Sequence, residues 1–240
     1  MIPLQFLGIG AAFAPAFGNT SACFQREETL YLLDCGSTVF GALLERKALQ
    51  SAKRVVVLIT HLHADHVGSL GTLISYCHHV QPMPVCVVHP DAALGELLRL
   101  NGIAEGRYTL CSTAHYRDEG IEARFYPVRH TQSLPAYGLL IETGGDAFYY
   151  SGDAAGVPPE IWQRFLAGEL AGLYQDSQLC AGENHPSHGS YSAFYRQCPP
   201  ELRSRFFPMH WDVDERAAIA RDGFGLAMPL EAERPENGNE

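Results

Sequence analysis

The chain has 240 residues, of which 46% are hydrophobic and 18% charged, and its formal net charge is −10. This composition is that of a globular protein with a large core, and it excludes a disordered or fibrous chain. The acidic balance argues against a general affinity for nucleic acid, which depends on a basic surface, although bound divalent ions would make a site locally positive.

The chain is expected to form a single domain over residues 1–230, with a frayed tail over 231–240 that is charged and contains Pro and Gly. Seven cysteines, an odd number without a Cys-x-x-Cys pair, favour free thiols in a reducing compartment over a disulfide framework. The first residues show no basic segment before an apolar stretch, and no apolar run reaches membrane-spanning length. We therefore expect a cytoplasmic protein without a membrane partner.

In the first half of the chain, short apolar runs alternate with helical segments. The expected strands are residues 29–33, 54–60 and 85–88, and the expected helices are 39–49, 67–76 and 91–100, the last with Asp91 as N-cap. The run at 54–60 is rich in valine, which is typical of a strand buried on both faces. It stops at a cluster of histidines that begins at His61.

The second half repeats this alternation. Strands are expected over residues 123–128, 138–142, 147–150, 170–174 and 205–209, and helices over 160–166, 192–197 and 214–220. The glycines at 144–145 indicate a hairpin turn between two of the strands. Residues that can bind metals follow several strands, and open α/β sheets place their sites at the carboxyl ends of strands.

The segment His61-Leu62-His63-Ala64-Asp65-His66 places three imidazoles and a carboxylate within six residues. These groups together suit Zn²⁺, Mn²⁺ or Fe²⁺. A tight loop that leaves a strand can aim alternate side chains at one point and later ones at a second point nearby. Since one ion needs three or four protein ligands, the cluster could begin two sites. We therefore predict a metal centre here, in preference to a surface loop that is rich in histidine by chance.

The pattern His-x-His-x-Asp-His resembles the motif of the metallo-β-lactamase-fold superfamily, and the similarity extends over nearly the whole chain. Residues 7–10 resemble the family's opening glycine-rich strand and turn, and residues 33–36 resemble its second strand and turn. His130, Asp153 and His210 match, in order, the places of the later family ligands. The resemblance implies an α/β fold, a four-layer αβ/βα sandwich with metals at one edge.

The resemblance also implies two divalent metal ions, with zinc as the first choice and manganese or iron as alternatives. It assigns His61, His63 and His130 to the first ion. It assigns Asp65, His66 and His210 to the second ion, and Asp153 would bridge the two. A hydroxide would be a second bridge, and bound metal lowers the pKa of such a water toward ~7, which makes it a nucleophile. Taken alone, His130 and His210 could be packing histidines at strand ends, and Asp153 could be a turn residue or an N-cap.

Further features resemble ribonuclease Z and related phosphodiesterases. Residues 127–138 are similar to a stretch in which a histidine ligand is followed by Ser or Thr and then by an aromatic residue and Gly. His188-Gly189-Ser190 resembles a motif whose histidine is not a ligand but donates a proton to the leaving oxygen. Asp176 would orient His188, so that Asp65, His188 and Asp176 are the expected catalytic residues. His185 is an alternative donor, and a solvated loop is the other interpretation of this segment.

Some features depart from ribonuclease Z. The segment between His130 and Asp153 holds only two strands and a turn, with no room for the long basic arm that grips tRNA. The motif at His188 lacks the family's Thr, and His210 is followed by an unusual Trp-Asp. With the acidic charge, these departures argue against tRNA processing. They favour a small or cyclic phosphodiester, such as a cyclic nucleotide or a cyclic sugar phosphate, with an RNA end as a further candidate substrate. One relative that acts on a cyclic substrate is the cyclic phosphodiesterase associated with carbon–phosphorus lyase. That enzyme has an additional structural zinc site formed by clustered cysteines, which this chain lacks.

Three hypotheses follow. The first is a phosphodiesterase that uses attack by a metal-bridging hydroxide and protonation by His188. The second is a carboxylic-ester, lactone or sulfate-ester hydrolase on the same metal site, which would not need the Asp176–His188 pair. The third is a non-catalytic binding or immunity-type protein that retains the fold, against which stand seven intact ligand positions. The expected partner is a small ester substrate, nucleic acid is not favoured, and the resemblance implies a homodimer as the candidate assembly.

Overall fold

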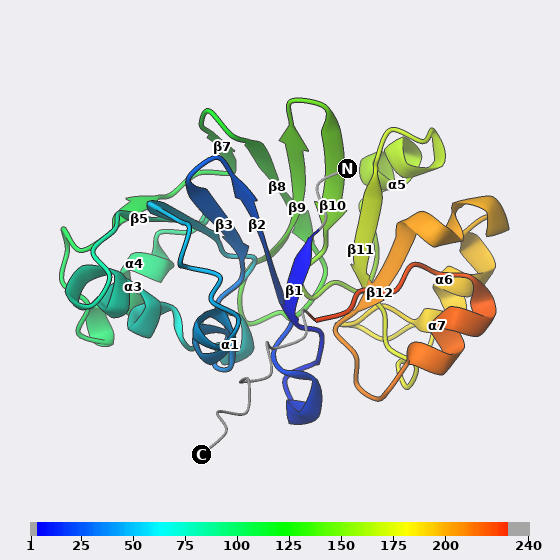
Figure 1. Ribbon diagram of the computed structural model, residues 1–240. Helices are drawn as coiled ribbons and strands as arrows, with labels where there is room; N and C mark the ends of the chain where they lie inside the picture. The colour runs from blue at the N-terminus through cyan, green and yellow to red at the C-terminus, as the bar shows by residue number, and fades with distance from the viewer. Residues whose placement is uncertain (1–3, 230–240) are drawn as a thin grey trace, which may run out of the picture.

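Two six-stranded sheets packed face to face form the centre of the computed structural model, which describes residues 4–229 (Figure 1). The first sheet has the order β1 (Gln5–Gly8), β2 (Ser21–Arg26), β3 (Thr29–Leu33), β4 (Arg54–Leu58), β5 (Val85–Val88) and β6 (Thr109–Cys111). The second has the order β12 (Phe206–Met209), β11 (Gly172–Asp176), β10 (Asp146–Tyr150), β9 (Ala136–Thr143), β8 (Glu122–Val128) and β7 (His115–Arg117). The tail expected over 231–240 lies outside the described residues.

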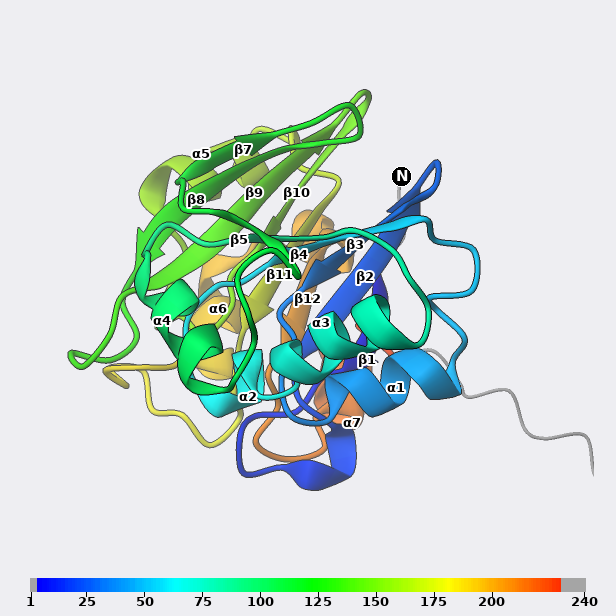
Figure 2. The same cartoon turned by 90° about the vertical axis from the view of Figure 1, so that its left-hand side faces the viewer.

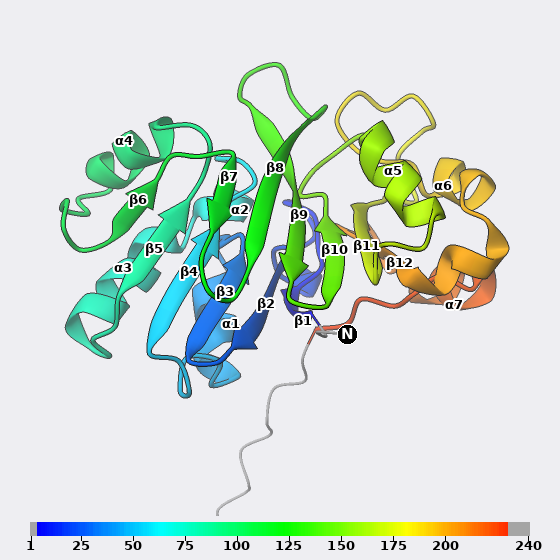
Figure 3. The same ribbon diagram turned by 90° about the horizontal axis from the view of Figure 1, so that it is seen from above.

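Helices cover the outer face of each sheet. On the first sheet lie α1 (Val39–Glu45), α3 (Leu70–His79) and α4 (Ala93–Leu100), and on the second lie α5 (Pro159–Leu166), α6 (Tyr191–Gln197) and α7 (Arg216–Asp222) (Figure 2). Seen from above, the two groups of helices lie on opposite sides of the paired sheets (Figure 3). The remaining helical segments of the described residues are short, namely α2 (Ala64–Val67) and the 3₁₀ helices η1 (Pro15–Phe17) and η2 (Pro200–Arg205). The predicted four-layer αβ/βα sandwich is confirmed.

Strand β4 shows why the valine-rich run forms a central strand. Val55, Val56 and Val57 have no exposed surface. Val56 belongs to the core between the two sheets, and its two neighbours pack beneath the helices of the first sheet. The strand therefore buries both faces, as a β-branched run without alternation predicts. Helix α3 completes that outer layer with buried residues at helical spacing, Leu70, Leu73, Ile74 and Cys77.

Most predicted elements exist, with shifted ends. The expected helix over 67–76 is wrong in one respect, because α2 and α3 are separate helices that Gly68 and Ser69 divide. A Cβ at Gly68 would lie 2.2 Å from the Oγ of Ser37 and 2.4 Å from the carbonyl of Ala64, so the close approach requires glycine. The expected strand over 54–60 ends at Leu58. Strands β2, β6 and β7 were not expected: β6 and β7 have three residues each, and β2 mixes polar and apolar residues.

The topology brings several strand ends to one edge of the molecule. Strands β3, β4 and β5 are parallel to one another, and so are β10, β11 and β12. The backbone N–H of Tyr137, at the start of β9, donates to the carbonyl of Thr60, just after β4, so the two sheets meet at this edge. All seven cysteines are free thiols. Over residues 4–229, no helix combines the length and the apolar character that crossing a membrane requires.

Candidate metal centre

Every residue predicted to bind metal lies just beyond a strand or in α2, at the edge where the strand ends meet. His61 and His63 follow β4, and Asp65 and His66 lie in α2. The other three, His130, Asp153 and His210, follow β8, β10 and β12. Chain segments that are distant in the sequence thus converge on one point, as the resemblance implied.

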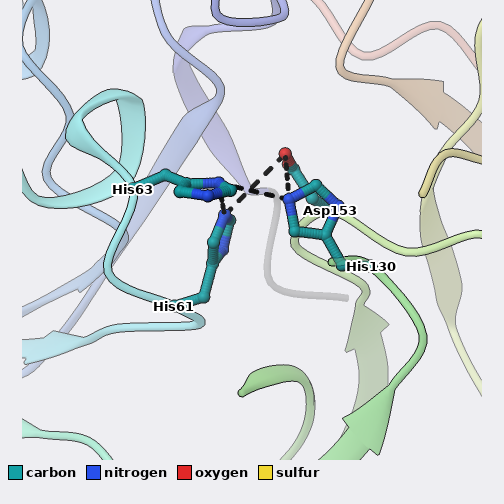
Figure 4. A group of neighbouring side chains, drawn as sticks. All are labelled: His61, His63, His130 and Asp153. Atoms are coloured by element: carbon teal, nitrogen blue, oxygen red, sulfur yellow. Dashed lines mark hydrogen bonds and ion pairs between the residues drawn. The ribbon is translucent and has the colours of Figure 1, made fainter. Parts of the chain in front are cut away.

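The first group consists of His61, His63, His130 and Asp153, whose ligand atoms all lie within 4.8 Å of one another (Figure 4). His63 Nδ1 lies 3.0 Å from His61 Nε2 and 3.2 Å from His130 Nε2. Asp153 Oδ2 lies 3.9 Å from His61 Nε2 and 3.6 Å from His130 Nε2. Three imidazoles and one carboxylate oxygen around one point match the donor set of a zinc, manganese or iron site.

The second group consists of Asp65, His66, Asp153 and His210. Asp153 Oδ1 lies 3.0 Å from His66 Nε2 and 3.1 Å from His210 Nε2. Asp65 Oδ2 lies 3.3 Å and 3.7 Å from the same two nitrogens. The two oxygens of Asp153 therefore face different groups, which is the arrangement that a bridging carboxylate requires.

Unsatisfied atoms also indicate that this second group suits a cation. His66 Nε2, His210 Nε2 and Asp153 Oδ1 are buried, and although both nitrogens lie within 3.1 Å of that oxygen, none of the three atoms makes a hydrogen bond of acceptable geometry. Buried polar atoms in folded proteins almost always have a partner. A divalent ion at the point that these three atoms face would satisfy all of them at once, so the residues present fit the metal that the fold implies.

Protonation states in the metal-free protein follow from burial and charge. Burial lowers the pKa of His210, but the charge of Asp153 and the other carboxylates outweigh it and raise this pKa to about 10. Likewise, the charges of Asp153 and Asp34 outweigh burial and hold the pKa of His66 well above its usual value. For His61, burial dominates and the pKa falls well below its usual value. Protons thus occupy part of the second group, and metal must displace them to bind.

Asp34 is an outer partner of the second group. It is fully buried, and its Oδ2 lies 2.8 Å from His66 Nδ1. The backbone N–H and the hydroxyl of Thr60 both donate to Asp34, at 2.7 Å and 2.9–3.0 Å. Such a partner fixes the ring orientation and leaves Nε2 for the metal. Asp34 adopts a left-handed backbone with φ of 61°, a strained conformation that its buried hydrogen bonds hold in place.

The first group has an outer partner of a different kind. His130 Nδ1 donates to the backbone carbonyl of Ser187, 3.0 Å away, which leaves Nε2 free to face the group. Ser187 lies in the segment 177–190 between β11 and α6, which we term the 177–190 loop. A peptide carbonyl carries no sequence signature, so this contact could not be predicted from residue types.

The predicted Asp176–His188 pair forms in the structure. His188 Nδ1 lies 2.8 Å from Asp176 Oδ2, and Asp176 is fully buried while the His188 side chain is 20% exposed. The His188 ring stacks on His210 with centroids 5.2 Å apart and lies 5.1 Å from the ring of His130. Burial lowers the pKa of His188, but the hydrogen bond and charge of Asp176 outweigh it and raise the pKa. With Nδ1 engaged, Nε2 is the nitrogen available beside the metal-binding groups.

A carboxyl pair anchors the start of the 177–190 loop. Glu215 is fully buried, and its Oε1 accepts the backbone N–H of Leu179 at 3.1 Å. Asp212 Oδ2 accepts the N–H of Cys180 at 3.0 Å. Burial, with the charges of Asp212 and Asp176, raises the pKa of Glu215 to about 9. Glu215 is therefore a neutral acid near pH 7, and its proton can bridge to Asp212.

We expect the variant Glu215→Gln to be more stable than the unchanged chain at pH 8 and about equally stable at pH 5. The pKa of Glu215 rises from 4.5 in the unfolded chain to about 9 in the folded one. The native state thus binds more protons between these values, and stability is lost as the pH rises through that window. The measurement is the melting temperature of metal-stripped protein, where roughly 2–4 °C corresponds to 1 kcal/mol. Equal differences at both pH values, or the same gain from exposed Glu201→Gln, would contradict this prediction.

Several residues of the centre were not predicted from the sequence. Asp34 and Thr60 each follow a strand, and that position alone could have marked them as candidates. Gln178, whose side-chain amide lies 3.1 Å from His210 Nδ1, carries no such signal. Four further histidines match no ligand position of the family, and we expected them to be structural or on the surface. Of these, His89 is buried with its Nδ1 donating to the carbonyl of Ile59. The other three are exposed, namely His78, His79 and His115.

A family model and several relatives match the sequence over most of its length. The model of the family described as Anti-Pycsar protein Apyc1 matches residues 2–228. A relative of that name from Saccharibacillus brassicae is 36% identical over 259 residues, covering 95% of this chain and 99% of the relative. Another of that name, from Bacillus phage vB_BsuM-Goe3, is 28% identical and covers 92% of this chain and 93% of the relative.

Solved structures show the same fold. The metallo-β-lactamase fold protein YhfI from Bacillus subtilis has a TM-score of 0.72 at 15% identity, with 95% of both chains covered. A diphosphatase from the PhnP family has a TM-score of 0.72 at 19% identity, with 96% and 97% covered. The short form of human tRNase Z has a TM-score of 0.68 at 18% identity, with 95% and 96% covered. The resemblance predicted from the histidine motif is confirmed at the level of the fold.

Proposed function

The chain belongs to the Anti-Pycsar protein Apyc1 family, and from that premise we propose that it is a dinuclear-metal phosphodiesterase that hydrolyses a cyclic nucleotide. The observation that carries the proposal is the pairing of two metal-binding groups that share Asp153 with a carboxylate–histidine pair beside them. An ester with a good leaving group would not need the second feature. A phosphodiester with an alkoxide leaving group does, because alkoxides leave poorly near neutral pH.

The charge of the surrounding segments supports a small substrate. The segments that carry the site residues, 60–69, 130–136, 151–158, 176–190 and 208–214, contain no lysine or arginine. Arg129, just before the second segment, is exposed. Long nucleic acids are held through many basic contacts to phosphates, which these segments do not offer. One phosphodiester charge facing two metal ions would need no such contacts, and the family name agrees with a cyclic nucleotide.

In this proposal, each group of the site has one task. Two divalent ions, with zinc as the first candidate, would neutralise the phosphate charge and supply an activated water as nucleophile. As the bond between phosphorus and the leaving oxygen breaks, His188 Nε2 donates a proton to that oxygen, so that a cyclic diester and water become a phosphate monoester. Asp176 holds the His188 ring by Nδ1 and stabilises its charged form.

The test uses metal-stripped protein to which Zn²⁺ or Mn²⁺ is returned. The substrates are bis-p-nitrophenyl phosphate, cyclic nucleotides, p-nitrophenyl acetate and p-nitrophenyl sulfate. We expect metal-dependent hydrolysis of a cyclic nucleotide to its monophosphate and of the activated phosphodiester. Turnover of the acetate or sulfate alone would instead support a carboxylic- or sulfate-ester hydrolase. No turnover of any ester by protein that holds two ions per chain would support a binding role.

A further inference from the structure

The 177–190 loop contacts both parts of the site at once. The Ser187 carbonyl accepts the Nδ1–H of His130, a member of the first metal-binding group. One residue later, His188 makes the hydrogen bond to Asp176. The peptide groups at 187 and 188 must therefore hold their orientation for both contacts to exist. No helix or strand covers residues 179–189, so another interaction has to fix this stretch of backbone.

His185 supplies that interaction through hydrogen bonds to the backbone. Its Nδ1 accepts the backbone N–H of Ser187 at 3.3 Å and that of His188 at 3.0 Å. The backbone N–H of His185 donates to the carbonyl of Gly182 at 2.9 Å. A side-chain acceptor that binds N–H groups two and three residues ahead is the geometry of an Asx turn, with an imidazole nitrogen in place of a carbonyl oxygen.

We propose that His185 is a positioning residue that fixes the 177–190 loop for two purposes, namely the orientation of His130 and that of His188. This inference rests on the proposed function. In this role His185 acts as an acceptor, because its Nδ1 accepts two backbone N–H groups. The role requires a hydrogen-bond acceptor at the position of His185 Nδ1. Any side chain that places an acceptor within reach of the same two N–H groups can fulfil it.

Three variants separate this role from the alternatives. In His185→Asn, the Oδ1 atom can accept the same two N–H groups, but the side chain cannot titrate near neutral pH. In His185→Phe, a ring remains that can pack against His188, whose centroid lies 5.3 Å from that of His185, but no acceptor remains. In His185→Ala, both are lost. If His185 were a proton donor, all three variants would lose its function. If its role were a ring contact, only His185→Asn and His185→Ala would lose it. If its role is to bind the backbone, only His185→Phe and His185→Ala lose it.

Two measurements provide the readout. The first is kcat and KM for a phosphodiester with an alkoxide leaving group, and the second is zinc affinity from competition with a chromophoric chelator. We expect Phe and Ala to lower kcat about 10-fold with little change in KM. Zinc affinity should fall about 10-fold or more, the scale seen when outer partners of metal ligands are removed. His185→Asn should restore both values to within about 3-fold of the unchanged chain.

The outcomes are decisive in either direction. The inference is overturned if Asn is as impaired as Ala, or if Ala and Phe match the unchanged chain in both measurements. If the unchanged chain has no phosphodiesterase activity, the proposed function fails, and zinc affinity in the same variants still decides whether His185 acts on His130. If His185→Ala does not fold, as judged by circular dichroism, the comparison of Asn with Phe carries the test.

Discussion

Replacement of Asp153 by asparagine is expected to remove metal binding and activity together. The two oxygens of Asp153 face separate groups, at 3.0–3.1 Å from the nitrogens of His66 and His210 and at 3.6–3.9 Å from those of His61 and His130. Asparagine keeps the shape but loses the negative charge that holds two cations near each other. The fall in zinc affinity should exceed the roughly 10- to 100-fold loss that outer partners cause, and hydrolysis should fall to background.

Metal content and zinc competition measure this effect directly, with circular dichroism to establish folding. His79→Ala is the matched control, because this histidine is exposed at the end of α3 and belongs to no metal-binding group. It should retain two ions and full activity. An Asp153→Asn protein that keeps two ions per chain at unchanged affinity would show that Asp153 is not the shared ligand.

Replacement of His188 by alanine should separate proton donation from metal binding. The Nδ1 of His188 is held by Asp176 at 2.8 Å, and its ring lies beside His130 and His210 without belonging to the two groups that Asp153 joins. General-acid catalysis contributes about 10²- to 10⁴-fold. We therefore expect a loss of this size for substrates with an alkoxide leaving group. The loss should be small for bis-p-nitrophenyl phosphate, whose leaving group needs little protonation.

The measurement is the ratio of the activity lost with an alkoxide leaving group to the activity lost with bis-p-nitrophenyl phosphate. Asp176→Asn should change this ratio in the same direction as His188→Ala, by a smaller factor. Both variants should still bind two zinc ions. Since Asp176, His188 and His210 also form a group with ligand atoms within 4.8 Å of one another, a loss of one ion would assign His188 to metal binding. Equal losses for both kinds of substrate would likewise refute the role as proton donor.

The histidine motif allowed the fold and the main residues of the site to be predicted, because its pattern is local. Three imidazoles and an aspartate within six residues indicate metal binding from the sequence alone. The later residues, His130, Asp153 and His210, are predicted only through the family resemblance, whose later ligands they match in order, and the topology brings them to the same edge. Their roles as ligands stay predictions until an ion is measured.

The parts that could not be predicted depend on backbone geometry. The partner of His130 is the carbonyl of Ser187, and every residue type has a carbonyl. His185 was one of two candidates for the proton donor, and its residue type could not reveal that its Nδ1 faces the backbone. Glu215 resembled any acidic residue near a helix start, since its burial depends on packing among segments distant in sequence.

The hairpin between β9 and β10 has a practical consequence. Strand β9 starts beside Thr60 at the metal edge and runs away from it, and β10 returns toward Asp153, so the turn lies at the far end of the molecule (Figure 1). A Cβ added to Gly144 or Gly145 would meet open space. A fluorophore, an affinity tag or a tether to a solid support attached at this turn would leave the opposite edge open to solution, which makes the turn a suitable attachment point for a biosensor built on this chain.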